Sequence, residues 1–264
     1  MTGFIGTGNM ASAMISGLVS SGTLKGKDIG VFDISAPKAQ ALAEKFGLSV
    51  FESAAELIVN CDRVVLSVKP NVLASVISPL RTIIKEKNPL IISIAAGKPL
   101  SFFEERLHEE VRLVRIMPNI NATVGEAVSA YCPNENATEA DAAFAEAMCK
   151  SFGTAVSLSE SMFPLFGVIG GSSPAFAYMF IDAMARAAVK NGMPKAQALE
   201  ICAQAVLGSA KMILETKEHP MELTDRVCSP GGTTIEGVLS LKKNGFEFSV
   251  ADAVQAAVEK DKLL

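Results

Sequence analysis

The chain has 264 residues, of which 49% are apolar and 20% charged, and its formal net charge is −4 with a pI near 5.4. This length allows one large domain or two modest ones, and the apolar share is ample for a packed core. The acidic balance and the lack of a dense Lys/Arg run disfavour a nucleic-acid or anionic-membrane surface.

The cysteine pattern indicates the cellular compartment of the protein. Five cysteines are scattered without a C-x-x-C pair, which is typical of buried thiols in a reducing compartment. No basic segment precedes the first apolar residues, so we expect no signal peptide and a cytoplasmic protein.

The uncharged stretch over 161–181 is long enough to raise the question of a membrane span. It is interrupted by Pro164, Gly170, Gly171 and Pro174, which favours a buried helix pair in a soluble domain.

The first twenty residues carry an informative pattern. Phe4 and Ile5 read as the end of a short buried strand, and apolar residues recur at helical spacing from Ala11 onward. Between them, Gly6 permits a tight turn and Gly8 lets a pyrophosphate approach the backbone. Free amides at the start of a helix suit an anion. The pattern therefore predicts a dinucleotide-binding turn.

A second predicted strand, over residues 29–33, ends in Asp33. This is the distance along the chain at which a ribose-binding carboxylate is expected. Such an acid favours the free 2′-hydroxyl of NAD and repels the 2′-phosphate of NADP. Ser35 and Lys38 could nevertheless accept that phosphate if their loop turns towards it. The residues therefore leave the choice between NADP and NAD open.

Strands and helices alternate through the first part of the chain. This alternation predicts right-handed crossovers and a doubly wound parallel sheet, which binds ligands at the carboxyl ends of its strands. We expect the turns at 6–8, 33–35, 68–70, 95–97 and 118–119 to line one cleft. We expect further strands at Val50 and over 63–68, 90–94, 111–117 and 155–158, and helices over 37–46, 53–60, 72–87 and 138–151, with capping boxes at Ser53 and Ser101.

From about residue 161, alanine-rich helices replace strands, so the predicted fold class is α/β: a doubly wound, Rossmann-type sheet followed by an all-α dimerisation domain. The predicted domains are 1–160, which binds the dinucleotide, and 161–264, which dimerises and binds substrate. Two long helices, predicted to end near Asn191 and Thr216, have small or apolar residues on most faces. A domain of this size can hardly bury such helices alone. We therefore expect a homodimer through these helices, possibly a higher oligomer.

Residues 228–234 read Cys-Ser-Pro-Gly-Gly-Thr-Thr and precede a predicted helix over 233–241. In isolation this is an ordinary loop and helix start. Two glycines, two threonines and a serine at one helix start also offer unhindered amides and three hydroxyls, which suits a carboxylate.

Six motifs, in order and over nearly the whole chain, resemble the pyrroline-5-carboxylate reductase family. They are FIGTGNMA at 4–11, VKP at 68–70, SIAAG at 93–97, RIMPN at 115–119, GSSPA at 171–175 and SPGGTT at 229–234, of which the last two are the specific ones. The family reduces the cyclic imine of 1-pyrroline-5-carboxylate to L-proline with a nicotinamide cofactor, the last step of proline biosynthesis. The resemblance implies that reaction here, with a small cyclic imino acid as substrate and NADP or NAD as cofactor.

The resemblance also implies the site residues. The implied cofactor-binding residues are Ile5, Gly6, Thr7, Gly8, Asn9, Met10, Asp33, Ser35, Val68, Lys69, Pro70, Ile94, Ala95, Ala96 and Asn119. The implied substrate-binding residues are Ser229, Gly231, Gly232, Thr233 and Thr234. Thr234 is the candidate catalytic residue: the loop lacks histidine, so either the substrate binds already protonated or Thr234 and water relay the proton.

Other readings remain. His108 and His219 lie among charged or polar residues and are expected to be exposed, and no cluster has metal-ligand spacing, so we expect no metal. One alternative is a dehydrogenase of the β-hydroxyacid or imine reductase type; the stretch at 170–174 lacks the lysine that a β-hydroxyacid enzyme would place there. The other is a non-catalytic dinucleotide sensor, which would not require the loop at 229–234.

Overall fold

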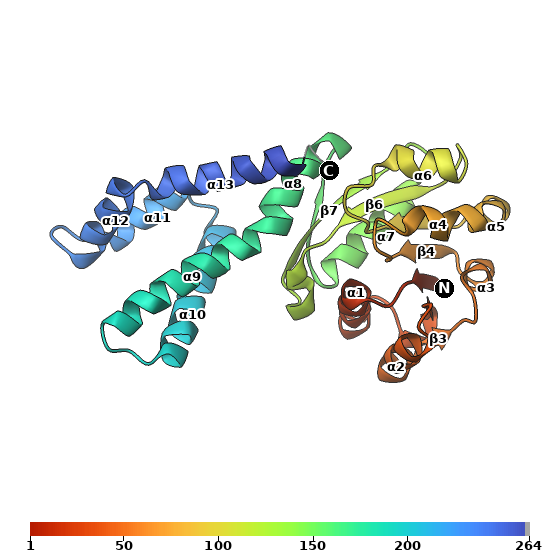
Figure 1. Cartoon of the computed structure of the whole chain (residues 1–264), viewed down its shortest axis with the longest axis horizontal. Coiled ribbons are helices and arrows are strands. Elements are labelled where there is room, and N and C mark those ends of the chain that lie inside the picture. The colour runs from red at the N-terminus through yellow and green to blue at the C-terminus, as the bar shows by residue number, and fades with distance from the viewer. Residues whose placement is uncertain (262–264) are drawn as a thin grey trace. The chain divides into compact units, whose positions relative to one another are not determined.

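The computed structural model describes residues 1–261 and contains two compact units, Met1–Gly171 and a second that begins at Ser172 (Figure 1). The first is built around an eight-stranded sheet and the second is all helix. The predicted fold class is confirmed. The predicted boundary after residue 160 stays a prediction; the first compact unit continues to Gly171 and has Phe163 in one of its apolar clusters.

The sheet has the strand order β3-β2-β1-β4-β5-β6-β7-β8. The first six of these strands are parallel, β7 is antiparallel to β6, and β8 is parallel to β7. Because β1 pairs with both β2 and β4, the strand order reverses beside β1, and ligands bind at such a point in doubly wound folds. The strands are β1 (Thr2–Ile5), β2 (Ile29–Phe32), β3 (Ser49–Val50), β4 (Arg63–Leu66), β5 (Leu90–Ser93), β6 (Leu113–Met117), β7 (Ala127–Pro133) and β8 (Gly153–Ser157).

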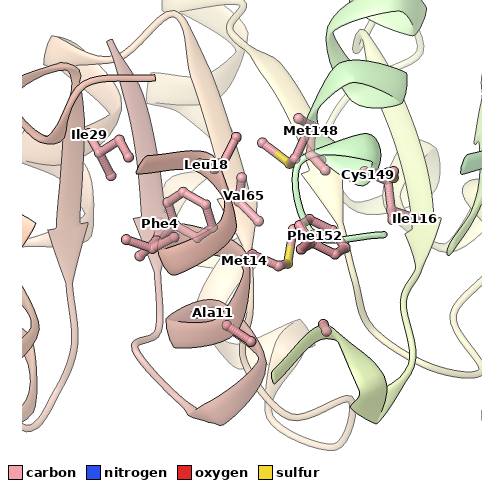
Figure 2. Packing of buried hydrophobic residues seen from close by; sticks show 14 of the residues in the cluster. Phe4, Ala11, Met14, Leu18, Ile29, Val65, Ile116, Met148, Cys149 and Phe152 are labelled. Atoms are coloured by element: carbon pink, nitrogen blue, oxygen red, sulfur yellow. The ribbon is translucent and has the colours of Figure 1, made fainter. Parts of the chain in front are cut away.

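Helices cover both faces of this sheet, so its central strands are apolar on both faces. Phe4 on β1 points to one side, where it packs with Met14, and its neighbour Ile5 points to the other, where it packs with Leu57 (Figure 2 shows the first side). Fully burying one such side chain contributes about 1.5–3 kcal/mol. The helices on the first side are α1 (Asn9–Ser20), α2 (Ala36–Phe46) and α7 (Glu139–Lys150), and those on the second are α3 (Ala54–Asn60), α4 (Leu73–Ile77), α5 (Arg81–Lys87) and α6 (Leu100–Arg106).

Local chemistry explains where the elements differ from the expected ones. The helix expected over 72–87 is interrupted by a 3₁₀ turn, Ser78–Leu80, because Pro79 has no amide to donate. At Ser53 the hydroxyl accepts from Glu56 N (3.1 Å), but the Glu56 carboxylate accepts from Glu52 N, so only half of that capping box forms. The capping box at Ser101 is wrong, because α6 already begins at Leu100.

The second unit contains α9 (Ser173–Lys190), α10 (Lys195–Thr216), α11 (Pro220–Val227), α12 (Thr233–Lys243) and α13 (Phe246–Asp261). The two long helices α9 and α10 pack against each other (Figure 1). A single copy leaves much of their apolar surface uncovered: Met179 is 73% exposed and Leu214 is 64% exposed. Within residues 1–261, the helical stretch Glu160–Lys190 is long and apolar enough to cross a membrane by length and composition, and only 17% of its most apolar window is buried. Uncovered apolar surface of this extent is typical of an interface.

The packing of α1 within the first unit can be tested at Gly17, in the middle of this helix. An exposed helical Gly→Ala change normally stabilises by about 1 kcal/mol. Here a Cβ would lie 2.7 Å from Phe152 Cβ and 2.8 Å from Ser151 O, so we expect Gly17→Ala to destabilise by about 1–3 kcal/mol, measured by urea unfolding. Gly237→Ala in α12, where a Cβ meets no atom within 4 Å, is the matched control. An unchanged or higher urea midpoint for Gly17→Ala would contradict the described packing.

Candidate active site

A cleft of about 550 Å³ lies at the carboxyl ends of β1, β2 and β4, beside the point where the strand order reverses. Its volume is in the range of small-molecule and cofactor sites. It is lined by Ile5, Gly6, Gly8, Phe32, Asp33, Ile34, Ser67, Val68, Lys69, Val72, Ser75 and Val76.

The turn between β1 and α1 is shaped by its two glycines. Gly6 has φ +98°, and a Cβ there would lie 2.8 Å from Ser67 O, so only glycine fits. At Gly8 a Cβ would meet no atom within 4 Å, so the backbone is open to a ligand. Gly8 is also the N-cap of α1 and offers no side-chain cap, which leaves the first amides of the helix without an intrahelical partner. Open amides at a helix start fit the pyrophosphate of a dinucleotide.

Asp33 holds this turn from the side of β2. Its Oδ2 accepts from Thr7 N (2.7 Å) and Thr7 Oγ1 (2.9 Å), and its Oδ1 accepts from Ser35 N (2.9 Å). Burial acts to raise the pKa of Asp33, but these hydrogen bonds and the charge of Lys38 outweigh it, so the pKa lies below its usual 3.8. The ionised carboxylate is therefore part of the turn as well as of the cleft wall.

Ser67 holds the same turn from the side of β4. Its Oγ donates to Ile5 O (3.0 Å) and Gly6 O (2.7 Å). Ser67 was not among the predicted site residues; the available signal was a single hydroxyl near the end of an otherwise apolar strand.

Apolar side chains form much of the remaining wall of the cleft. Ile34, in the connection between β2 and α2, is 98% exposed, and Phe32, Val72 and Val76 complete this surface. An apolar wall beside an acidic group suits a base and its ribose. These residues were also missed; the signal at Ile34 was an isoleucine beside Asp33 in a loop, where a polar residue is usual.

The structure brings six of the predicted cofactor-binding residues to the cleft. They are Ile5, Gly6, Gly8, Asp33, Val68 and Lys69. Thr7 lies just beneath it, 6% exposed and bonded to Asp33. Asn119 is 5% exposed and donates from Nδ2 to Gly170 O (2.8 Å). The other predicted cofactor-binding residues, which do not line this cleft, are Asn9, Met10, Ser35, Pro70, Ile94, Ala95 and Ala96.

The predicted substrate loop lies in the second unit, between α11 and α12. Gly231 has φ +70°, and Gly232 N donates to Ser229 O (3.0 Å), which forms a tight turn before Thr233. Gly232 caps α12 without a side-chain hydrogen bond. Within residues 1–261, no hydrogen bond occupies the hydroxyls of Ser229, Thr233 or Thr234. The loop therefore presents an open helix start and three unpaired hydroxyls.

The two histidines differ in their exposure to solvent. His219 is exposed as expected, and its Nδ1 accepts from Met221 N (3.2 Å). His108 is only 8% exposed, so the expectation of an exposed side chain is wrong. The reason is that α6 ends at Arg106, so His108 does not belong to the charged helix face on which it was placed. Among the described residues, no group of three or more His, Cys, Asp or Glu side chains is arranged to hold a metal ion.

A doubly wound sheet with a glycine turn, open helix amides and a strand-end carboxylate at its switch point defines a dinucleotide-binding fold. Two family models match the chain. The model described as NADP oxidoreductase coenzyme F420-dependent matches residues 1–97, and the model described as pyrroline-5-carboxylate reductase dimerisation matches residues 160–264.

Relatives match the whole chain. Pyrroline-5-carboxylate reductases of Methanosarcina acetivorans and Escherichia coli are 44% and 43% identical to it, each covering 99% of this chain and 97% of the relative. Among solved structures, a pyrroline-5-carboxylate reductase of Coxiella burnetii has a TM-score of 0.94 and 32% identity, covering 99% of this chain and 97% of that one. The Plasmodium falciparum enzyme with NADP bound has a TM-score of 0.86 and 31% identity, with the same coverage. The chain belongs to the pyrroline-5-carboxylate reductase family.

The hydrogen bonds of Asp33 predict how stability depends on pH. The folded-state pKa is depressed, so the stabilisation is present above about pH 4 and is lost as the pH falls through the lower folded-state value. We expect Asp33→Asn to lower the unfolding free energy by about 1–3 kcal/mol near neutral pH. The difference from wild type should shrink towards zero in urea titrations at progressively lower pH. Asp28→Asn is the matched control, because Asp28 is exposed and its carboxylate has no hydrogen bond within residues 1–261. A difference that persists unchanged below the folded-state pKa would contradict the role given to the carboxylate.

Proposed function

We propose that this protein is a pyrroline-5-carboxylate reductase, which reduces the C=N bond of 1-pyrroline-5-carboxylate to give L-proline. The observation that carries the proposal is the identity of 43–44% to two such enzymes over 99% of the chain. A cleft built for a dinucleotide in the first unit and an open helix start with three hydroxyls in the second are the chemical parts that the reaction needs.

The first unit binds the cofactor. The amides at the start of α1 take the pyrophosphate, and Asp33 lies beside the adenosine ribose. Val68 and Lys69 flank the cofactor along the cleft. The remaining residues of this proposed site are Asn9, Met10, Ser35, Pro70, Ile94, Ala95, Ala96 and Asn119. Bound NADH or NADPH supplies the hydride.

The loop at 229–234 binds the substrate. The amides at the start of α12 and the hydroxyls of Ser229 and Thr233 hold the carboxylate, and Gly231 and Gly232 leave its approach unhindered. Holding the carboxylate fixes the imine carbon for hydride transfer, and orientation of this kind lowers a barrier by several kcal/mol, up to about 7–11 in favourable cases.

Thr234 is the proposed catalytic residue. It is the second residue of α12 and is half-buried, and its hydroxyl, which no other described residue engages, can bond to the ring nitrogen. An imine accepts hydride best as the protonated iminium ion. Either the substrate binds already protonated, with Thr234 holding it, or Thr234 and water relay the proton.

The uncovered apolar faces of α9 and α10 support a homodimer through the second unit, in accord with the dimerisation model that matches residues 160–264. A higher oligomer can build on the same unit.

The five cysteines are free, and burial raises the pKa of Cys61 to about 11 and that of Cys149 to about 12, so these thiols stay protonated. Free, inert thiols support a cytoplasmic location.

An assay of the purified protein tests the function. We expect NAD(P)H oxidation with 1-pyrroline-5-carboxylate and no NAD(P)+ reduction with β-hydroxyacids. Thr234→Ala should lower kcat/KM by roughly 10- to 100-fold, because a hydrogen bond to the reacting group is lost. Thr234→Ser, which keeps the hydroxyl, is the matched control. Turnover of hydroxyacids alone would overturn the proposed reaction, and full activity of Thr234→Ala at every pH would remove Thr234 from it.

Cofactor preference is tested at the end of β2. Asp33→Asn removes the charge that repels a 2′-phosphate, so the ratio of kcat/KM for NADPH to that for NADH should rise by about tenfold. The ratio cancels any common loss from the turn that Asp33 holds. Lys38→Gln should change the ratio in the opposite direction, since Lys38 is the cation beside Asp33. If Asp33→Asn changes both values equally, the carboxylate acts only on the turn.

A further inference from the structure

A second cavity, of about 320 Å³, lies between α5 and the segment that follows α6. It is lined by Arg81, Lys85, His108, Glu109 and Glu110 and shares no residue with the cofactor cleft. The segment that carries His108 leads into the amino end of β6, whereas the cofactor cleft lies at the carboxyl ends of the strands.

The walls of this cavity are held in place by the surrounding chain. Arg81 Nε donates to Leu107 O (2.7 Å), and Asn136 Nδ2 donates to Glu109 O (2.6 Å). The first bond fixes the guanidinium against the end of α6, and the second fixes the backbone beside His108. A cavity whose shape exists before binding loses little entropy when a ligand enters.

The buried His108 ring lacks hydrogen-bond partners. The residue is 8% exposed, and its Nδ1 and Nε2 atoms are shielded from solvent and have no hydrogen-bond partner. Burial, aided by the charges of Lys85 and Arg81, lowers the pKa of the imidazole below its usual 6.5, and the charge of Glu110 opposes this. The ring is therefore neutral near pH 7, with one donor and one acceptor unpaired. A buried polar group left unpaired costs about 1–3 kcal/mol.

The charges around the cavity are of both signs and do not neutralise one another in pairs. Within residues 1–261, Arg81, Lys85, Glu109 and Glu110 take part in no salt bridge. A simple anion would be attracted by the two cations but repelled by the two carboxylates, and a simple cation would meet the reverse. A small molecule that carries both charges satisfies both sets of groups, and the volume is sufficient for one.

We propose that this cavity is a second ligand site, which binds a free amino acid as its zwitterion. The ligand's carboxylate lies against Arg81 and Lys85, and the buried His108 ring forms part of the cavity wall. Its ammonium group lies against Glu109 and Glu110. The site stands apart from the reaction assigned to the cofactor cleft, and its test does not depend on that reaction.

The two histidines of the chain allow a direct test by NMR. In the full-length protein with ¹⁵N-labelled histidine, only His108 and His219 contribute imidazole signals, and His219→Gln assigns them. Each of the twenty common amino acids is added at about 10 mM, or at saturation where it is less soluble, which is enough to detect a millimolar Kd. We expect at least one to shift the His108 signals saturably and to raise the pKa of His108, with the His219 signals unchanged. If none of the twenty does so, the proposal is wrong.

Matched ligands and variants test the two-charge recognition. Blocking either charge of the binding amino acid, as its N-acetyl or its amide derivative, should weaken binding by at least about fivefold. Lys85→Gln should weaken it by a similar factor. Lys87→Gln on the same helix, which does not line the cavity, should bind as wild type does. Equal binding of the N-acetyl derivative, or wild-type affinity in Lys85→Gln, would overturn the assignment. Imine reduction by Lys85→Gln without added amino acid should equal that of wild type.

Discussion

The cofactor cleft depends on one turn that is held from both sides. Asp33 accepts three hydrogen bonds, two of them from Thr7, and Ser67 donates to the carbonyl groups of Ile5 and Gly6. The three strands that carry these residues are neighbours in the sheet. The amides at the start of α1 are therefore fixed before any ligand arrives, and a preorganised anion site needs no rearrangement on binding.

Many strands of the first unit could be predicted from continuous apolar runs in the sequence. Residues such as Val64 and Val65 are fully buried on opposite faces, so a continuous apolar run correctly indicates a strand covered on both sides. The strand β7 escaped prediction because polar and small residues interrupt it, and its antiparallel pairing with β6 follows from tertiary contacts. The helix α13 was not predicted either; it begins at Phe246, directly after Gly245, whose φ of +73° is typical of the end of a helix.

The parts of the candidate site that depend on backbone geometry could be predicted from the sequence. Gly6, Gly8 and Asp33 could be found because turn geometry and chain distance restrict those positions to few residue types. Ile34 could not, since its exposure depends on the path of a loop. His108 shows the opposite error: charged neighbours suggested a solvated helix face, but the helix ends two residues earlier and the ring turns inward.

The uneven distribution of buried surface has a consequence for biogenesis. The first unit completes its two larger apolar clusters from residues that leave the ribosome first, so it can adopt its structure during translation. The later helices α9 and α10 emerge with uncovered apolar side chains that only association can shield. Maturation of the second unit should therefore be a bimolecular, concentration-dependent event, and nascent chains at low abundance would linger in a state that chaperones recognise.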